Sequence, residues 1–257
     1  MSALTTCDLI PDIPGRRAGA VLNIDFEPGQ VWGVLGPNGA GKSTLLHTLA
    51  GLHLPRAGQV RLDGTPLTSL SRRQIARQLG LLFQDRHDGF PATVLETALI
   101  GRHPHLSPWQ TESAGDVERA IEALKTLGLL DLKDRLISQL SGGERQRVAL
   151  ATLMTQAPVV WLADEPANHL DLHHQVNVMS LLTRQARSGA TVIMSLHDLN
   201  LAARWCDHIL LLYPDGNACW GGAASMLEPA ALEALYGQRL SRVNVDGLPV
   251  FVPVAHS

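Results

Sequence analysis

The fold of this 257-residue chain is decided by the stretch Val31-Trp-Gly-Val-Leu35-Gly36-Pro-Asn-Gly-Ala-Gly41-Lys42-Ser43-Thr44. Its first five residues predict a buried strand, and the leucines after Thr44 recur with the spacing of a helix that buries one face. Between strand and helix lies the pattern G-x-x-x-x-G-K-[ST], in the context that this motif requires. Glycines there let successive backbone N–H groups turn toward phosphate oxygens, and the helix directs its positive end at them.

This phosphate loop, Gly36–Ser43, therefore predicts a site for the phosphates of a nucleotide such as ATP, with Mg²⁺. Lys42 is expected to neutralise the β and γ phosphates, and the Ser43 hydroxyl is expected to ligate Mg²⁺. The predicted nucleotide contacts are Gly36, Pro37, Asn38, Gly39, Ala40, Gly41, Lys42, Ser43 and Thr44. The alternative interpretation is a glycine-rich turn between a strand and a helix that binds nothing.

A second apolar run, Val159–Ala163, ends in the two carboxylates Asp164 and Glu165. Neighbouring residues on a strand point to opposite faces, so the two acids need not share one role. Asp164 is expected to hold Mg²⁺, and Glu165 to accept a proton from the water that attacks the γ-phosphate. Taken alone, such a pair is more often a helix cap or a solvated corner. After a phosphate loop it is the expected second half of a nucleotide site.

Composition excludes several classes of protein. Apolar residues make up 45% of the chain and charged residues 18%, which is typical of a soluble protein with a buried core. The net charge is 21 − 24 = −3, so broad nucleic-acid binding is not expected. No apolar run approaches the roughly 20 residues that cross a bilayer, and the N-terminal residues do not resemble an export signal. The three cysteines are widely spaced, which favours a reducing compartment.

Strands alternating with helices predict an α/β fold with a mostly parallel sheet. Val21–Phe26 alternates apolar and polar residues and predicts a strand, and Gln59–Asp63 predicts another that ends in a turn. These segments predict an antiparallel β part near the N-terminus. A helical block interrupts the α/β pattern, and valines around Asp246-Gly247 predict a C-terminal hairpin. We therefore expect one domain over 1–257, with a catalytic α/β core at 1–84 and 157–240. The helical subdomain is expected at 85–156 and the hairpin tail at 241–257.

The segment Leu140-Ser-Gly-Gly-Glu-Arg-Gln-Arg147 resembles the signature of ATP-binding-cassette (ABC) ATPases. Other motifs of that family follow in the family's order over about Val21–Tyr236. They are the phosphate loop, Gln84 after the Leu81-Leu82-Phe83 strand, the signature, the acidic strand, the Asn168-His169-Leu170-Asp171 turn and His197.

The resemblance implies a role for each of these positions. Gln84 would contact Mg²⁺ and the attacking water, and His197 would hold the γ-phosphate and orient Glu165. Two chains would pack head to tail as a homodimer, with Asp171 acting across the seam. The signature residues of one chain would then cover the γ-phosphate bound by the phosphate loop of the other; they are Ser141, Gly142, Gly143 and Glu144. A second helix start with bare N–H groups is consistent with a second anion contact.

The resemblance also implies partners. The segments around Asn38, His197 and Tyr236 look like those of importers for haem, ferric siderophores and cobalamin. A chain of this kind would bind a transmembrane permease dimer at the cytoplasmic face of the bacterial inner membrane. It would act indirectly with a periplasmic substrate-binding protein and would bind no nucleic acid. Two alternatives are a soluble ABC-type ATPase acting on a macromolecule, such as a repair or translation factor, and a binding module that does not hydrolyse ATP.

Two features depart from the family or invite another interpretation. The family usually stacks adenine on an aromatic residue upstream of the phosphate loop, but no aromatic residue precedes Phe26. The expected substitutes are Arg16 or Arg17, by a cation–π contact over the ring, or an apolar residue such as Ile13. Five histidines suggest haem or metal binding, but we interpret them as surface or interface residues without a ligand. They are His103, His105, His169, His173 and His174.

Overall fold

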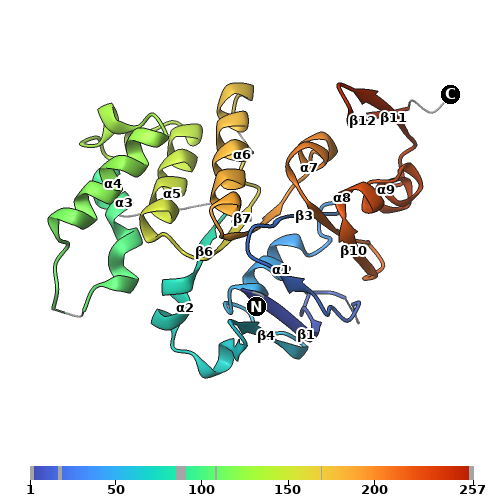
Figure 1. Cartoon of the computed structure of the whole chain (residues 1–257), viewed down its shortest axis with the longest axis horizontal. Coiled ribbons are helices and arrows are strands. Elements are labelled where there is room, and N and C mark those ends of the chain that lie inside the picture. Colours follow the sequence, from blue (N-terminus) through green and yellow to red (C-terminus); the bar gives the residue numbers. More distant parts are fainter. Residues whose placement is uncertain (1–2, 17–18, 85–90, 108, 169, 255–257) are drawn as a thin grey trace.

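The computed structural model describes residues 3–16, 19–84, 91–107, 109–168 and 170–254 (Figure 1). In these residues a six-stranded sheet runs through the middle of the molecule, in the order β10-β9-β3-β8-β7-β6. Its strands are β3 (Val31–Leu35), β6 (Leu79–Leu82), β7 (Val160–Asp164), β8 (Thr191–Ser195), β9 (His208–Leu212) and β10 (Ala218–Gly222). All neighbours pair in parallel except β10, which pairs antiparallel with β9 at one edge. The predicted α/β fold with a mostly parallel sheet is confirmed.

Both faces of this sheet are covered, which explains why its strands are continuous apolar runs. On β3, Val31 and Leu35 belong to one hydrophobic core, whereas Trp32 and Val34 belong to the other. Successive side chains of a strand point to opposite faces, so a strand between two layers needs apolar residues at every position. All five residues of β3 are buried.

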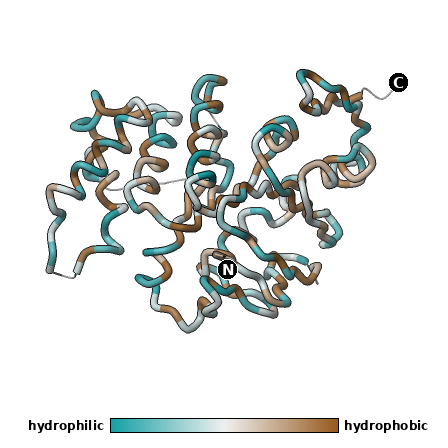
Figure 2. The backbone as a smooth tube through the Cα atoms, in the orientation of Figure 1, coloured by the Kyte–Doolittle hydropathy of each residue, from teal (hydrophilic) through white to brown (hydrophobic). Residues whose placement is uncertain are grey.

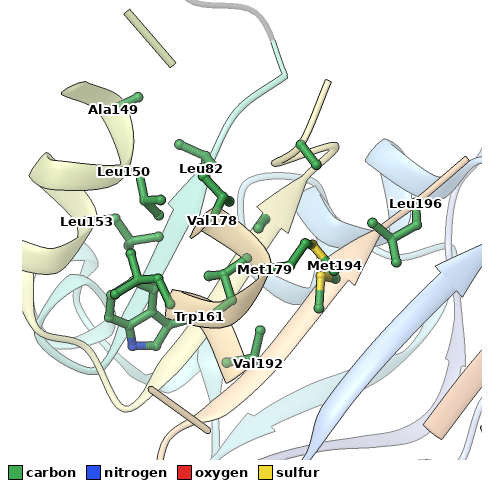
Figure 3. Close-up of a cluster of buried hydrophobic side chains, with 14 of the residues drawn as sticks. Leu82, Ala149, Leu150, Leu153, Trp161, Val178, Met179, Val192, Met194 and Leu196 are labelled. Atoms are coloured by element: carbon green, nitrogen blue, oxygen red, sulfur yellow. The ribbon is translucent and has the colours of Figure 1, made fainter. Parts of the chain in front are cut away.

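One face packs against α5 (Gly142–Gln156) and α6 (Leu172–Arg187). Figure 3 shows Trp161 of β7 beneath Leu150 and Leu153 of α5, with Met179 of α6 nearby. The indole Nε1 of Trp161 donates to the carbonyl oxygen of Pro158 at 2.8 Å, so this large buried ring leaves no polar atom unpaired.

The other face is covered by α1 (Lys42–Leu49) and by an antiparallel sheet, as expected near the N-terminus. That sheet has the order β2-β1-β4-β5. Its strands are β1 (Leu4–Ile10), β2 (Asp25–Phe26), β4 (Ala57–Leu62) and β5 (Thr65–Pro66). The strand expected over Val21–Phe26 is shorter, because Leu22 makes only an isolated bridge to Leu9. The helix α1 stops before Gly51, which has a φ of 68°.

The antiparallel sheet is followed by η1 (Leu67–Ser69) and α2 (Arg72–Gln78), which lead to β6. The helical block comes after β6 and contains α3 (Val94–Leu99), η2 (Ile100–His105), α4 (Ala114–Thr126), η3 (Leu130–Leu132), η4 (Ile137–Gln139) and α5. Helices α3, α4 and α5 pack against one another, to one side of the sheet in Figure 1. Each of α2, α3, α4 and α5 begins with a reciprocal capping box. The exact subdomain boundaries at residues 84 and 157 stay a prediction.

The chain ends with α7 (Leu199–Trp205), α8 (Ala223–Met226), α9 (Pro229–Tyr236) and a hairpin of β11 (Leu240–Val245) and β12 (Leu248–Pro253). Asp246 and Gly247 have φ of 51° and 81°, the left-handed values that a tight two-residue hairpin turn requires. Figure 2 shows hydrophobic segments running through the middle of the molecule, with hydrophilic stretches on the outer helices. No helix in the described ranges combines the length and the apolar character needed to span a membrane.

Candidate functional site

The predicted phosphate loop, Gln84, Glu165 and His197 meet at the carboxyl edge of the parallel sheet. The phosphate loop follows β3, Gln84 lies two residues after β6, Glu165 follows β7, and His197 lies two residues after β8. In a parallel sheet these ends share one edge, which is where ligands of open α/β sheets bind. Segments more than 150 residues apart in sequence, such as Gly41 and His197, thus line one cleft.

The phosphate loop holds its shape through two glycines with different requirements. Gly41 precedes α1 with a φ of 95°, and a Cβ there would overlap the side chain of Ile13. A Cβ on Gly36 would lie 2.6 Å from the carbonyl oxygen of Leu212, which is closer than real contacts allow. Lys42 extends back over the loop, and its Nζ donates to the carbonyl oxygens of Gly36 at 2.8 Å and Pro37 at 3.3 Å.

Lys42 is the cation of this cleft, and it is 6% exposed. Burial lowers the pKa of its ammonium group, and the nearby carboxylates of Glu165 and Asp164 oppose that shift to a smaller extent. Hydrogen bonds to backbone carbonyl oxygens alone compensate poorly for the cost of burying a charged ammonium group. The negative charge of a nucleotide phosphate would therefore be a favourable partner for it.

Glu165 has the most constrained side chain of the site. Its side chain is 6% exposed, and its carboxylate accepts a hydrogen bond from Gln84 Nε2 at 2.8 Å. The same carboxylate also contacts Asn168 Nδ2 and His197 Nε2. The backbone of Glu165 has a φ of 51°, a left-handed value that costs energy for a residue with a Cβ. Three neighbours thus orient a carboxylate at the mouth of the phosphate loop.

Ser195, at the end of β8, connects the two acids and was not identified from the sequence. Its Oγ donates to Asp164 Oδ1 at 2.5 Å and accepts from the backbone N–H of Glu165 at 2.9 Å. The hydroxyl is completely buried. The available signal was a polar residue that ends an otherwise apolar strand, two positions before a predicted site histidine. Asn168 was part of a family turn, but its contact with Glu165 was not expected.

The cleft has a volume of about 550 Å³. Its lining is formed by Ile13, Pro14, Asn38, Gly39, Ala40, Gly41, Lys42, Ser43, Thr44, Gln84, Glu165 and His197. Asp164 lies just beneath this lining and is 2% exposed. The hydroxyl of Ser43, the amide oxygen of Gln84 and the carboxylate of Asp164 form a set of oxygen donors, which is the set that Mg²⁺ prefers. The residues present therefore fit the predicted ion.

The structure distinguishes between the residues that were expected to contact adenine. Ile13 and Pro14 line the cleft beside the phosphate loop. The guanidinium of Arg16 does not line it, because this group donates to the carbonyl oxygens of Gly39, Ala40 and Tyr213 at 3.0–3.2 Å. Arg16 therefore supports the phosphate loop from outside the cleft. Arg17 lies outside the described residues.

The structure does not bring the signature segment to the phosphate loop of the same chain. Neither Ser141–Glu144 nor Asp171 lines the cleft. Ser141 caps α5, and its hydroxyl and backbone N–H donate to Glu144 at 2.7 and 2.8 Å. Asp171 caps α6 by accepting from the backbone N–H of His174 at 2.9 Å, and this hydrogen bond lowers its pKa. These residues can contact a nucleotide only if it is bound elsewhere, for example by a second chain.

The histidines with a suggested metal role are dispersed among different partners. His105 Nε2 lies 3.0 Å from the carbonyl oxygen of Gln156, and His103 Nε2 lies 3.8 Å from Glu112. His173 bonds to Asn177, and His174 to Asp171. No group of three or more metal-binding side chains occurs in the described part of the chain. His169 lies outside it.

Comparison with known proteins gives consistent matches. A family model described as ABC transporter matches residues 20–168. The hemin import ATP-binding protein HmuV of Myxococcus xanthus is 40% identical over 242 residues, which cover 91% of this chain and 90% of that protein. The ferric enterobactin transport ATP-binding protein FepC of Escherichia coli is 34% identical and covers 92% and 88%. A solved inward-facing ABC transporter of the metal-chelate type has a TM-score of 0.87 at 29% identity, covering 99% and 98%.

Proposed function

This chain belongs to the ABC transporter family, and we propose that it is the ATP-hydrolysing subunit that powers a bacterial importer of haem, another iron chelate or cobalamin. The observation that carries the proposal is the Glu165 carboxylate, oriented by Gln84, Asn168 and His197 at the mouth of the phosphate loop. The cargo class is supported by relatives named for hemin, ferric enterobactin and cobalamin import. Their match over most of the chain favours an importer over a soluble ATPase.

The phosphate loop binds ATP by surrounding its phosphates with backbone N–H groups and with the start of α1. Lys42 would exchange its hydrogen bonds to Gly36 and Pro37 for bonds to phosphate oxygens. Mg²⁺, when bound, neutralises charge on the β and γ phosphates. Ser43, Gln84 and Asp164 would hold it. Ile13 and Pro14 would contact the adenine, so that an apolar surface replaces the usual aromatic ring.

Glu165 would accept the proton of the water that attacks the γ-phosphate. Gln84 Nε2 donates to Glu165 from the cleft side, and would orient that water as well. His197, in contact with the same carboxylate, would hold both Glu165 and the γ-phosphate in place. A carboxylate fixed at three contacts loses little entropy on reaching the reactive geometry.

Two copies would close around ATP, each supplying its signature to the phosphate loop of the other. The support is that Ser141–Glu144 and Asp171 lie outside the cleft of their own chain. ATP would bind better to the closed dimer, and this difference in affinity is what can change the orientation of a permease dimer. We place the chain at the cytoplasmic face of the inner membrane, with a periplasmic substrate-binding protein as indirect partner.

Uptake of labelled haem, ferric siderophore and cobalamin tests this proposal. Cells lacking the gene would be compared with cells that carry the wild type or Glu165→Gln. We expect uptake of one cargo to return only with the wild type. If uptake of none of the three depends on the gene, the importer assignment is wrong, whereas the ATPase assignment is tested separately by turnover of the purified protein.

A further inference from the structure

We propose that a second pocket, separate from the nucleotide cleft, binds a small soluble anion that carries a phosphate group. This pocket lies between the C-terminal end of α4, the side of α5 and one face of α6, which stand together in Figure 1. It has a volume of about 390 Å³ and shares no residue with the nucleotide cleft. We call it the basic pocket, after Lys125, Arg147, His173, His174 and Arg184 in its lining.

The charged side chains that line the basic pocket are all basic. Lys125, Arg147 and Arg184 contribute three cations, and no carboxylate belongs to the described lining. Acids outside the lining offset some of this charge. Glu122 lies 3.9 Å from Lys125. Asp171 accepts from the backbone N–H of His174 as the cap of α6, and its Oδ1 lies 2.7 Å from His174 Nδ1. Glu144 is bound to Ser141, whose backbone N–H lowers its pKa, and Arg147 adds a smaller effect.

Arg147 is held so that part of its donor set has no acceptor. Its Nη1 donates to the carbonyl oxygen of Leu127 at 3.0 Å, and this bond fixes the guanidinium at the end of α4. Its Nε is buried and has no hydrogen-bond partner among the described residues. A buried unpaired donor on a charged group is unfavourable, and the negative charge of an anion in the pocket would stabilise this guanidinium.

The face of α6 opposite Arg147 supplies complementary donors. Asn177, Ser180 and Arg184 lie one turn after another along that face and line the pocket. In the described part of the chain, the Arg184 guanidinium makes no hydrogen bond or ion pair. Two guanidinium groups with neutral donors between them suit a phosphate, because each planar group can bind two of its oxygens. The pocket is also large enough for a diphosphate or a phosphate ester.

The test is calorimetric titration of pyrophosphate into the full chain, with the nucleotide cleft saturated by Mg·ADP. We expect the wild type to bind one pyrophosphate and Arg184→Gln to weaken its affinity about tenfold, as expected for the loss of one charge-assisted hydrogen bond. Arg184 is exposed, so this variant should fold normally. Arg147→Lys, which keeps the charge but loses the planar donors, should also weaken binding. The matched control is Arg119→Gln, which removes one positive charge from an exposed position on α4 outside the pocket.

Several results would overturn the proposal. They are an absence of pyrophosphate binding once ADP is saturating, equal weakening by Arg119→Gln, and affinity that Arg184→Gln leaves unchanged. Binding only to vesicles that contain phosphatidic acid would assign the pocket to a lipid headgroup and contradict a soluble ligand.

The variant Lys42→Ala distinguishes binding at the nucleotide cleft from binding at the basic pocket. It should remove ADP binding by the cleft while pyrophosphate binding by the basic pocket persists, so failure of one assignment leaves the other measurable.

Discussion

At the scale of single residues, the proposed hydrolysis depends on the position of one carboxylate, that of Glu165. Glu165 is held by side chains from three separate segments, and its own backbone adopts a strained left-handed conformation. Strain of this kind persists only where surrounding contacts impose it. The position of the carboxylate is therefore a property of the whole carboxyl edge of the sheet, and each contact can be tested by substitution.

Replacing Glu165 by Gln should remove the proton acceptor while keeping the size and most hydrogen bonds of the side chain. We expect ATP turnover to fall about a thousandfold, within the range typical of a lost general base, while ATP binding persists. Turnover and ATP-induced dimerisation, measured by phosphate release and by light scattering, check this. The control Glu118→Gln removes a carboxylate from an exposed position on α4. Full turnover in Glu165→Gln would show that another group accepts the proton.

Ser195→Ala should disturb both acids at once, because one hydroxyl contacts Asp164 and the backbone of Glu165. We expect the free energy of unfolding to fall by about 1–3 kcal/mol, the cost of leaving buried polar groups unpaired. We also expect more Mg²⁺ to be needed for half-maximal turnover, because Asp164 loses the bond that orients it.

A matched control for Ser195 lies on the same strand. Thr191 is fully buried, and its hydroxyl has no hydrogen-bond partner in the described part of the chain. Thr191→Val should therefore leave stability and Mg²⁺ dependence close to those of the wild type. If Ser195→Ala and Thr191→Val behave alike in urea unfolding and Mg²⁺ titration, the bridging role of Ser195 is wrong.

From the sequence we could propose the site residues whose type suits the chemistry, but not those whose importance comes from their position in the fold. A lysine directly after a glycine-rich loop, between a strand and a helix, is typical of phosphate binding, so Lys42 was predictable. Ser195 was not, because a hydroxyl at a strand end is common, and only the pairing of β7 with β8 brings it beside Asp164. The role of Arg16 was ambiguous for the same reason. An arginine suits both stacking on an adenine ring and bonding to carbonyl oxygens of the phosphate loop, so the residue type does not distinguish the two roles.

At the scale of elements, helix ends are where local sequence determined structure most directly. Helix α4 begins at a capping box, in which Ser113 donates to Asp116 from its hydroxyl at 2.7 Å and from its backbone N–H at 3.0 Å. Arg102 adds an ion pair to the same carboxylate at 2.7 Å. Asp116 is 8% exposed, so the three donors act in a largely buried setting. One carboxylate thus connects η2 to the start of α4.

This arrangement predicts a pH dependence of stability. The hydroxyl of Ser113, followed by its backbone N–H and by Arg102, lowers the pKa of Asp116 from 3.8 to about 2. A carboxyl group with a lowered pKa stabilises the fold above its ordinary pKa, and that stabilisation is lost as the pH falls through the lowered value. We expect the unfolding free energy of the wild type to fall more steeply than that of Asp116→Asn between about pH 4 and pH 2. Equal slopes in urea unfolding series would contradict this.

Long periodic elements were predictable and short or edge elements were not. Helices α5 and α6 follow from regular apolar spacing that one buried face requires. The strand over Val21–Phe26 was overestimated, because alternation of apolar and polar residues predicts burial of alternate side chains but not hydrogen bonding to a neighbour. Only Asp25 and Phe26 pair regularly with β1. Strand β10 was missed, because an edge strand with partly exposed residues carries little apolar pattern.

At the scale of the whole molecule, the chain carries two helix starts suited to phosphate that do not meet. The start of α1 faces the nucleotide cleft, while the start of α5, with Ser141, lies outside it. The sequence order predicted both motifs, but only the fold shows that the start of α5 does not line the cleft of its own chain. If a second copy supplies the signature to this cleft in trans, two variants that are inactive for different reasons should restore ATP turnover when they are mixed.

Lys42→Ala removes the phosphate-loop cation, and Ser141→Arg blocks the signature with a bulky side chain. Each variant alone should give almost no ATP turnover, because every site of a head-to-tail dimer then contains one damaged half. In a mixed dimer, both damaged halves fall in the same site and the other site is intact. An equal mixture should therefore recover roughly one quarter of the wild-type turnover if chains pair at random.

A mixture as inactive as its components would show either that each chain completes its own site or that one intact site is not enough for hydrolysis. Trapping labelled ATP in the mixture separates these cases, because only assembly in trans creates an intact site that binds it tightly.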